Sequence, residues 1–169
     1  MKLLFISDIH GITKNLDYID NIITNKNIDK LIVLGDLYSN YNDNLEVNQF
    51  LLKFKDKLIC IKGNCDSNIN IEGIEMVSTI KKIEIDSINI YITHGDRYNY
   101  ENNNLLKNSI LVYGHKHYPF IKKKDDITYI CVGSISLPRN NSDPTYMIYE
   151  NNKFIIYNID GDVIDGIEV

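Results

Sequence analysis

The chain has 169 residues, of which 44% are hydrophobic and 24% charged, and its net charge at pH 7 is −5. This length predicts a single domain, residues 1–169, that buries roughly 70% of the surface of the unfolded chain. The composition is typical of a globular protein and excludes extensive disorder, and the acidic balance argues against binding of long nucleic acid, which needs a basic surface.

The three cysteines, Cys60, Cys65 and Cys131, are an odd number and show no CxxC spacing. A secreted disulfide framework or a zinc site made of thiolates is therefore not expected, and a reducing cytoplasm fits better. The apolar run at the N-terminus ends at Ser7. It is too short for a signal peptide or a membrane span, so no membrane association is predicted.

The first half alternates buried strands with amphipathic helices. Nearly continuous apolar runs predict strands at 2–7, 31–34 and 58–61. A helix is expected around 16–23, where four apolar residues share one face, and a second is expected to begin near Asp43, with Glu46 three residues later, and to continue through Phe54. Right-handed crossovers in such a β-α-β-α-β unit give a parallel sheet with the polar ends of all three strands at one edge.

The second half consists of short β-type runs at 80–85, 88–93, 110–113, 118–121, 127–132, 146–149, 154–159 and 163–169. Hairpin turns are expected at Asp86-Ser87, Asp125-Asp126, Asn151-Asn152 and Asp160-Gly161. Only residues 101–108 suggest another helix. This pattern predicts an α/β protein in which a second, largely antiparallel sheet packs against the first.

Polar side chains that can bind metal directly follow several of the predicted strands. They are Asp8, His10, Asp36, Asn64, His94, His115 and His117, and they include every histidine of the chain. In an extended chain residues i and i+2 point the same way, so the rings of His115 and His117 can converge beyond the strand that precedes them. The ends of strands in open sheets are where ligands bind, which makes this edge the candidate site.

Two carboxylates, one amide and four imidazoles are too many ligands for one zinc ion, which takes about four. They suit two metal ions that share a bridging carboxylate and leave positions open for water. Mixed nitrogen and oxygen ligands without sulfur favour Mn, Fe, Zn, Co or Ni over Mg, Ca or Cu(I).

Each residue taken alone has a simpler interpretation. Asp8 could cap the first helix, Asp36 could be a turn residue, and Asn64 could occupy a turn that tolerates a left-handed conformation. His94 precedes a glycine and could be a loop residue. A metal site explains all of these placements together, whereas the simpler interpretations need several independent coincidences.

The motifs Asp-x-His, Gly-Asp, Gly-Asn-x-Asp, His-Gly and Gly-His-x-His, in this order and each after a strand, resemble the calcineurin-like metallophosphoesterase superfamily. Residues 63–67, 111–117 and 133–138 more narrowly resemble its small prokaryotic YfcE-type phosphodiesterase branch. The resemblance implies a four-layer α-β-β-α sandwich of two packed mixed sheets flanked by helices. It also implies two divalent metal ions, Mn first, with Ni, Fe, Zn, Co and Mg as alternatives.

The resemblance further implies which residues hold each ion. One ion would be held by Asp8, His10, Asp36 and His117, and the other by Asp36, Asn64, His94 and His115. Such an enzyme hydrolyses a small phosphodiester by in-line attack of a metal-activated water, with no covalent phospho-enzyme. Whether the chain forms a homo-oligomer is left open.

Cys65 and Asp66 complete the catalytic candidates, which are Asp36, Asn64, His94, Cys65 and Asp66. In much of the superfamily a histidine follows the motif asparagine and is thought to protonate the leaving group. A thiol, with a reference pKa of about 8.5, is a weaker donor, so Cys65 has either this role or a structural one. Asp66 either orients a ligand or caps a helix.

Several other residues have two possible roles. Arg139 either reaches a substrate oxygen or is a surface residue. Tyr38 and Tyr41 either stack on a base or aryl group or are ordinary loop residues. Lys116 is expected to face solvent, and Cys60 and Cys131 are expected in the core.

Two other functions compete with phosphodiester hydrolysis. The first is a non-catalytic scaffold or binding module, because the same fold resembles a retromer subunit whose metal site is degraded. The second, within enzymes, is a phosphomonoesterase or nucleotide pyrophosphatase, since the metal ligands set the reaction and the loops set the substrate.

Overall fold

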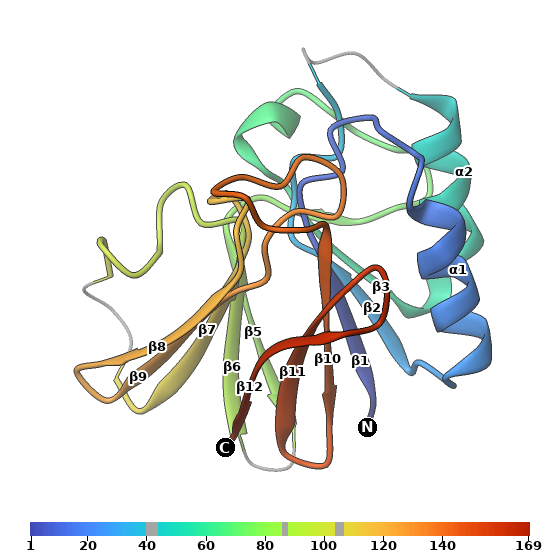
Figure 1. Ribbon diagram of the computed structural model, residues 1–169. Coiled ribbons are helices and arrows are strands. Elements are labelled where there is room, and N and C mark those ends of the chain that lie inside the picture. Colours follow the sequence, from blue (N-terminus) through green and yellow to red (C-terminus); the bar gives the residue numbers. More distant parts are fainter. Residues whose placement is uncertain (40–43, 86–87, 104–106) are drawn as a thin grey trace.

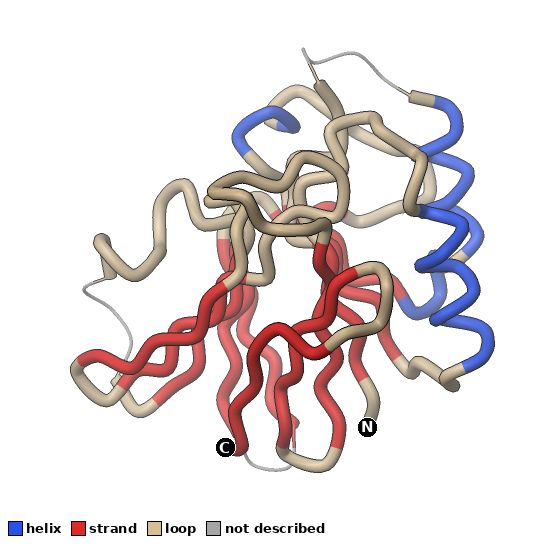
Figure 2. Tube along the Cα trace, viewed as in Figure 1, coloured by secondary structure: helices blue, strands red, loops and turns tan. Residues whose placement is uncertain are grey.

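The computed structural model describes residues 1–39, 44–85, 88–103 and 107–169. Two β-sheets pack face to face, and the α-helices of the described residues lie against the outer face of the larger sheet (Figure 1). The loops that follow many of the strands gather at one end of this sandwich, opposite the two termini (Figure 2).

The larger sheet has the strand order β12-β11-β10-β1-β2-β3-β4. Its strands are β1 (Leu3–Ile6), β2 (Lys30–Val33), β3 (Leu58–Ile61), β4 (Met76–Val77), β10 (Thr145–Glu150), β11 (Lys153–Asn158) and β12 (Val163–Glu168). Strands β1 to β4 run parallel to one another, which confirms the parallel sheet expected for the first half. The expectation that the three C-terminal runs join the second sheet is wrong, because β10 pairs antiparallel with β1 and leads into β11 and β12.

Strand β10 lies centrally because alternate side chains supply two different hydrophobic clusters. Tyr146 and Ile148 pack in the cluster beneath the helices, whereas Met147 and Tyr149 pack in the cluster between the two sheets. Such a strand buries apolar residues on both faces and is more stable in the middle of the layers than at an edge.

The smaller sheet has the strand order β5-β6-β7-β9-β8. Its strands are β5 (Ile80–Ile85), β6 (Ile88–Thr93), β7 (Ser109–Tyr113), β8 (Phe120–Lys124) and β9 (Ile127–Cys131). The β6–β7 and β7–β9 pairs are parallel, so this sheet is mixed rather than largely antiparallel. The reason is that β9, the second strand of the β8–β9 hairpin, lies beside β7 while β8 occupies the edge.

The two predicted helices of the first half are confirmed as α1 (Leu16–Asn25) and α2 (Leu45–Lys53). Asn44 caps α2, since its side-chain oxygen accepts hydrogen bonds from the backbone N–H groups of Glu46 and Val47 at 3.0 and 3.2 Å. The expected capping residue Asp43 lies outside the described residues. The sequence did not predict β4 or the short 3₁₀ helices η1 (Lys55–Lys57) and η2 (Asn64–Asp66).

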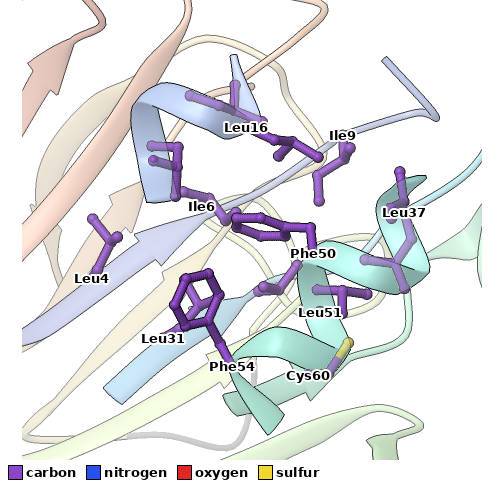
Figure 3. Packing of buried hydrophobic residues seen from close by; sticks show 14 of the residues in the cluster. Leu4, Ile6, Ile9, Leu16, Leu31, Leu37, Phe50, Leu51, Phe54 and Cys60 are labelled. Atoms are coloured by element: carbon purple, nitrogen blue, oxygen red, sulfur yellow. The ribbon is translucent and has the colours of Figure 1, made fainter. Parts of the chain in front are cut away.

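The parallel strands place alternate residues in two cores. Leu4 and Ile6 of β1 pack against both helices, while Leu3 and Phe5 pack against the smaller sheet. Figure 3 shows the first of these cores, in which side chains from the strands and helices interdigitate around Phe50. These two cores fix the larger sheet between the helices and the smaller sheet, and so fix where its strand ends lie.

The predicted sandwich of two mixed sheets with helices is confirmed, but its fourth layer differs from the expectation. Of residues 101–108, those that the structure describes are not helical, and 104–106 lie outside the described ranges. Instead, the Asn99 side-chain oxygen accepts hydrogen bonds from the N–H groups of Glu101 and Asn102, which stabilises a turn. Tyr98 and Tyr100 cover the outer face of the smaller sheet from this loop.

Three of the predicted hairpin turns connect strands as expected. Asp125-Asp126 and Asn151-Asn152 adopt the positive φ angles of tight turns, and Asp160-Gly161 separates β11 from β12. The fourth, Asp86-Ser87, lies outside the described residues. Within the described ranges, no helix has the length and apolar character that a membrane crossing requires.

Candidate metal centre

The predicted ligands all lie in segments that directly follow strands, at the end of the sandwich where the loops gather (Figure 2), and Asn64 begins the 3₁₀ helix η2. Strand β1 leads to Asp8 and His10, β2 to Asp36, β3 to Asn64, β6 to His94, and β7 to His115 and His117. Strands from both sheets therefore supply ligands, and the site lies across the junction of the two sheets.

The backbone at these ligands is unusual. Asp8, His10, Asp36, His115 and His117 all have positive φ angles, between 51° and 64°. A non-glycine residue in this left-handed region costs of order 1–3 kcal/mol, and such residues concentrate at functional sites. The positive φ angles of His115 and His117 show that the expectation of an extended segment at 114–117 is wrong. As a consequence, the two imidazole rings turn toward different parts of the site.

Four side chains form a first group, made of Asp8, His10, Asp36 and His117, whose ligand atoms all lie within 4.8 Å of one another. The Nε2 atom of His117 lies 3.3 Å from Asp8 Oδ1 and 3.3 Å from the Nε2 atom of His10. Ligand atoms that share one metal ion are separated by roughly 3.0–3.5 Å, given bonds of about 2.0–2.2 Å. The contacts of His117 match this spacing, whereas the Nε2 atom of His10 lies slightly farther from Asp8 Oδ1, at 3.9 Å, and from Asp36 Oδ2, at 3.6 Å.

A second group contains Asp36, His94 and His115, again within 4.8 Å. The Nε2 atom of His94 lies 3.4 Å from Asp36 Oδ2 and 3.2 Å from the Nδ1 atom of His115. Asn64 joins this group, since its Oδ1 atom lies 3.1 Å from the same Nε2 atom. Asp36 belongs to both groups and is the side chain that can bridge two ions.

Backbone carbonyls orient two of the imidazoles. The Nδ1–H group of His94 donates to the carbonyl oxygen of Leu34 at 2.8 Å, and that of His117 donates to the carbonyl oxygen of Leu137 at 2.7 Å. Each Nε2 atom is then left with a lone pair that points into the site. The sequence did not predict these two acceptors, because every residue carries a carbonyl group and no side-chain pattern marks them.

The donor set fits divalent cations. Lone pairs of His94 and His117 point toward carboxylate oxygens and toward other imidazoles, an arrangement that repels unless a proton or a cation lies between the atoms. Asp8 Oδ1 is buried and has no hydrogen-bond partner among the residues that the structure describes. A buried carboxylate oxygen of this kind is stabilised by a metal ion.

Burial and charge shift the pKa values of these groups. Burial raises the pKa of Asp8 to about 7. Burial would lower the pKa of His94, but its hydrogen bond to Asp36 and the nearby carboxylates outweigh this effect and raise it to about 9. Burial likewise opposes ionisation of Asp36, yet the same contact with His94 holds its pKa well below the usual range. The site therefore binds protons tightly where cations would otherwise lie.

Comparison with known protein families shows to which family the chain belongs. Residues 1–153 match the model of the calcineurin-like phosphoesterase superfamily domain. The chain belongs to this superfamily. Over 163 residues it is 27% identical to phosphodiesterase YfcE of Escherichia coli strain K12, which covers 90% of this chain and 89% of YfcE. This superfamily assignment confirms the prediction of a phosphoric ester hydrolase.

Solved structures agree with this assignment. A structure of the E. coli phosphoesterase YfcE superposes with a TM-score of 0.89 at 26% identity and covers 99% of this chain and 98% of that one. The resemblance to the YfcE-type branch is thus confirmed. Vps29 of Entamoeba histolytica, solved in complex with Zn²⁺, gives a TM-score of 0.67 at 19% identity, covering 99% of this chain and 98% of Vps29, and shares the fold.

Cys65 supports the metal centre of this phosphoesterase through its backbone. Its N–H group donates to Asp36 Oδ1 at 2.9 Å, which fixes the carboxylate that both groups share. Burial and the neighbouring carboxylates raise the pKa of its thiol to about 12. A thiol with this pKa stays protonated but is a weak acid, which favours the structural role of Cys65 over that of proton donor.

Asp66 connects two of the ligand loops. Its buried carboxylate accepts hydrogen bonds from the N–H groups of Leu37 at 3.0 Å and Gly63 at 2.9 Å. These two residues adjoin Asp36 and Asn64. Asp66 therefore caps η2 and at the same time holds the loops after β2 and β3 together, so both sequence interpretations of this residue apply.

The sequence predictions for three further residues, Lys116, Tyr38 and Tyr41, have different outcomes in the structure. The Nζ atom of Lys116 forms an ion pair with Glu101 at 2.8 Å, away from the imidazoles. Tyr38 is fully buried and donates a hydrogen bond to Asn48, which favours the second of its two interpretations, an ordinary loop residue, over stacking on a substrate. Tyr41 lies outside the described residues.

Arg139, Cys60 and Cys131 agree with their sequence interpretations. The side chain of Arg139 is exposed, and its charge contributes to lowering the pKa of His117 after the larger effect of burial, so both of its possible roles remain. Cys60 and Cys131 are buried in the core.

We predict that the stabilisation of the protein by Mn²⁺ increases with pH. In the metal-free protein the site residues act in opposite directions, because burial lowers the pKa of His10, His115 and His117 and these groups favour the folded state more as pH rises, whereas Asp8 and His94 favour it less. The pKa of Asp8 is 3.8 when unfolded and about 7 when folded, so its contribution is complete below 3.8 and lost as pH rises through about 7. The contribution of His94, with values of 6.5 and about 9, is complete below 6.5 and lost as pH rises through about 9. Since cations replace these protons, stabilisation by Mn²⁺ should increase with pH.

Thermal unfolding at about pH 5 and about pH 8, with and without Mn²⁺, measures this effect. The increase in unfolding temperature caused by Mn²⁺ should be larger at the higher pH. A Mn²⁺-induced increase that is equal at both pH values, or larger at the lower one, would contradict the prediction.

Proposed function

We propose that this chain is a dinuclear metal-dependent phosphodiesterase that hydrolyses small phosphodiesters by in-line attack of an activated water. The observation that carries the proposal is the position of Asp36, whose carboxylate belongs to both groups of ligands. One carboxylate between two sets of imidazoles is the arrangement by which a protein holds two ions about 3.5–4 Å apart.

The proposed ligands are buried on one side of the site and accessible to solvent on the other. Asp8, Asp36, His94 and His117 are buried, whereas His10, Asn64 and His115 are partly or fully exposed. A substrate phosphate therefore approaches from the side of these three residues. Two bound cations would lower the pKa of a water molecule, orient it and neutralise the phosphate oxygens.

The donor atoms support Mn²⁺ as the first choice of metal. Imidazoles supply four of the proposed ligands and oxygen atoms supply the other three, with no sulfur. Fe, Zn, Co and Ni suit the same set, and Mg suits it less well because it prefers oxygen and water.

Two observations support a small phosphodiester with a good leaving group as the substrate. The relative YfcE is a phosphodiesterase. In this chain the residue at the proton-donor position is Cys65, whose raised pKa makes it a weak acid. Aryl and nucleotide phosphates need little protonation of the leaving group and so suit this site. The net charge of −5 disfavours long nucleic acid as substrate.

A panel of aryl phosphomonoester, aryl phosphodiester and nucleotide pyrophosphate substrates tests the proposal. Each substrate is assayed with metal-free protein and after addition of Mn²⁺, Mg²⁺ or Zn²⁺. We expect no turnover without metal, the largest kcat/KM with Mn²⁺, and a preference for the diester. Undiminished turnover of the metal-free protein would refute the proposal, and a preference for the monoester or pyrophosphate would favour the alternative enzyme class.

The scaffold alternative makes a different prediction in the same experiment. A binding module with this fold would turn over none of these substrates, with or without added metal. The paired ligand groups and their left-handed backbone argue against this function, because a scaffold has no need of such a costly arrangement.

The proposal also includes the cellular compartment and the functional unit of the enzyme. Cys60, Cys65 and Cys131 are free thiols, which supports the reducing cytoplasm as its compartment. We further propose that the functional unit is the single domain formed by both sheets. A homo-oligomer stays a prediction that light scattering would test.

A further inference from the structure

The loop between β9 and β10, residues 132–144, crosses the end of the sandwich where the ligands lie (Figure 1). Its first part is anchored to the larger sheet, since the N–H group of Ile135 donates to the carbonyl oxygen of Ser7 at 3.0 Å. Asn15, which precedes α1, donates from its side chain to the carbonyl oxygen of Ile135 at 2.6 Å. The loop is therefore fixed against the segment that carries Asp8.

Ser134 is the most constrained side chain of this loop. It is fully buried, and its hydroxyl donates a hydrogen bond to the backbone carbonyl oxygen of Asp8 at 2.8 Å. The same oxygen accepts hydrogen bonds from the N–H groups of Ser136 at 3.1 Å and Leu137 at 2.8 Å. One donor and two acceptor positions are all that a serine hydroxyl has, and all are in use.

Both ends of this small network adjoin proposed metal ligands. Asp8 carries a buried carboxylate on a left-handed backbone, which needs support from its surroundings. The carbonyl oxygen of Leu137 accepts the hydrogen bond from His117 Nδ1, which turns the Nε2 lone pair into the site. Asp8 follows β1 of the larger sheet, and His117 follows β7 of the smaller sheet.

We propose that Ser134 is a positioning residue that sets the affinity of the first group for its ion. This role rests on the proposed dinuclear site. Ser134 links the Asp8 carbonyl oxygen to the N–H group of Leu137, the residue whose own carbonyl orients His117, and so fixes two ligands of that group that come from different sheets. The second group is oriented separately, because His94 donates to the carbonyl oxygen of Leu34.

Titration of metal-free protein with Mn²⁺ by isothermal titration calorimetry tests the role of Ser134. Wild-type protein should show two binding events. In Ser134→Ala one event should weaken by roughly 10- to 100-fold, the usual effect of losing a residue that orients a ligand, and the other should be unchanged. Raising the Mn²⁺ concentration should restore kcat of this variant.

Thr145→Val is the matched control. The Thr145 hydroxyl is buried and donates to the carbonyl oxygen of Val132 at 2.7 Å, at the base of the same loop. This variant also loses a buried hydrogen bond, so its unfolding temperature should fall, but both Mn²⁺ affinities should stay at the wild-type values. A cooperative thermal unfolding transition in each variant would show that both variants fold.

Three outcomes would overturn the positioning role. They are two unchanged binding events in Ser134→Ala, equal weakening of both events, or the same selective weakening in Thr145→Val. The last two would show that the loop acts on the fold as a whole. Wild-type protein that binds no Mn²⁺ would instead refute the proposed dinuclear function, and the role of Ser134 with it.

Discussion

Replacing Asp36 by Asn is expected to lower kcat for an aryl phosphodiester by about 10³-fold or more, which corresponds to about 4 kcal/mol of transition-state stabilisation. The amide has nearly the same shape as the carboxylate but no negative charge, so it cannot bridge two cations in the same way. Both ligand groups contain Asp36, and both should lose affinity. Saturating Mn²⁺ should therefore fail to restore the activity, in contrast to Ser134→Ala.

Asp20→Asn serves as the control for this substitution. Asp20 lies on α1 and forms an ion pair with Lys53 on α2, away from the loops that carry the ligands. Its removal should leave kcat and Mn²⁺ binding unchanged, because exposed ion pairs contribute little. If Asp36→Asn kept more than about a tenth of wild-type kcat, a loss of less than about 1.4 kcal/mol, the bridging role of Asp36 would be wrong.

Replacing Gly114 by Ala is expected to have the second largest effect. A Cβ atom at this position would lie 1.8 Å from Ser7 Oγ and 2.6 Å from Asp8 Oδ2, far inside van der Waals contact. The strand end that carries His115 must then move away from the Asp8 carboxylate, which accepts the His115 N–H at 3.0 Å. We expect activity to fall by roughly 10²-fold and stability by about 1–3 kcal/mol.

The effect of Gly114→Ala is measured by kcat/KM with saturating Mn²⁺ and by chemical denaturation. Gly166→Ala on the edge strand β12 is the control, since a Cβ atom there comes no closer than 3.3 Å to Phe154 O. That variant should keep wild-type activity. Wild-type activity and stability in Gly114→Ala would show that the contact between the loops after β1 and β7 is not needed.

The chemistry of the site could be predicted from the sequence because its ligands are rare residues in informative places. All four histidines follow apolar runs, and a strand that ends in a polar residue marks the edge of a parallel sheet. The parallel order of β1, β2 and β3 followed from the same pattern, as did the strands at 80–85 and 88–93.

Other features depended on contacts between distant residues. The sheet to which β10 belongs is set by which cores its two faces fill, and alternating apolar residues fit either sheet equally well. A helix was expected at residues 101–108, but Asn99 forms a turn at the start of this segment through its side chain. Tyr38 lies in a loop, as expected, but is fully buried there.

The sequence by itself determined which side chains could bind metal and at which strand ends they lie, because local residue patterns specify strands and the atoms that follow them. The division of the ligands into two groups around Asp36 was available beforehand only as what the family resemblance implies. Only the tertiary structure decided how these ligands are held, through left-handed backbone angles and through the carbonyl oxygens of Leu34 and Leu137 that orient the imidazoles. Backbone groups are the same in every residue, so their part in a site becomes visible only when the chain has folded.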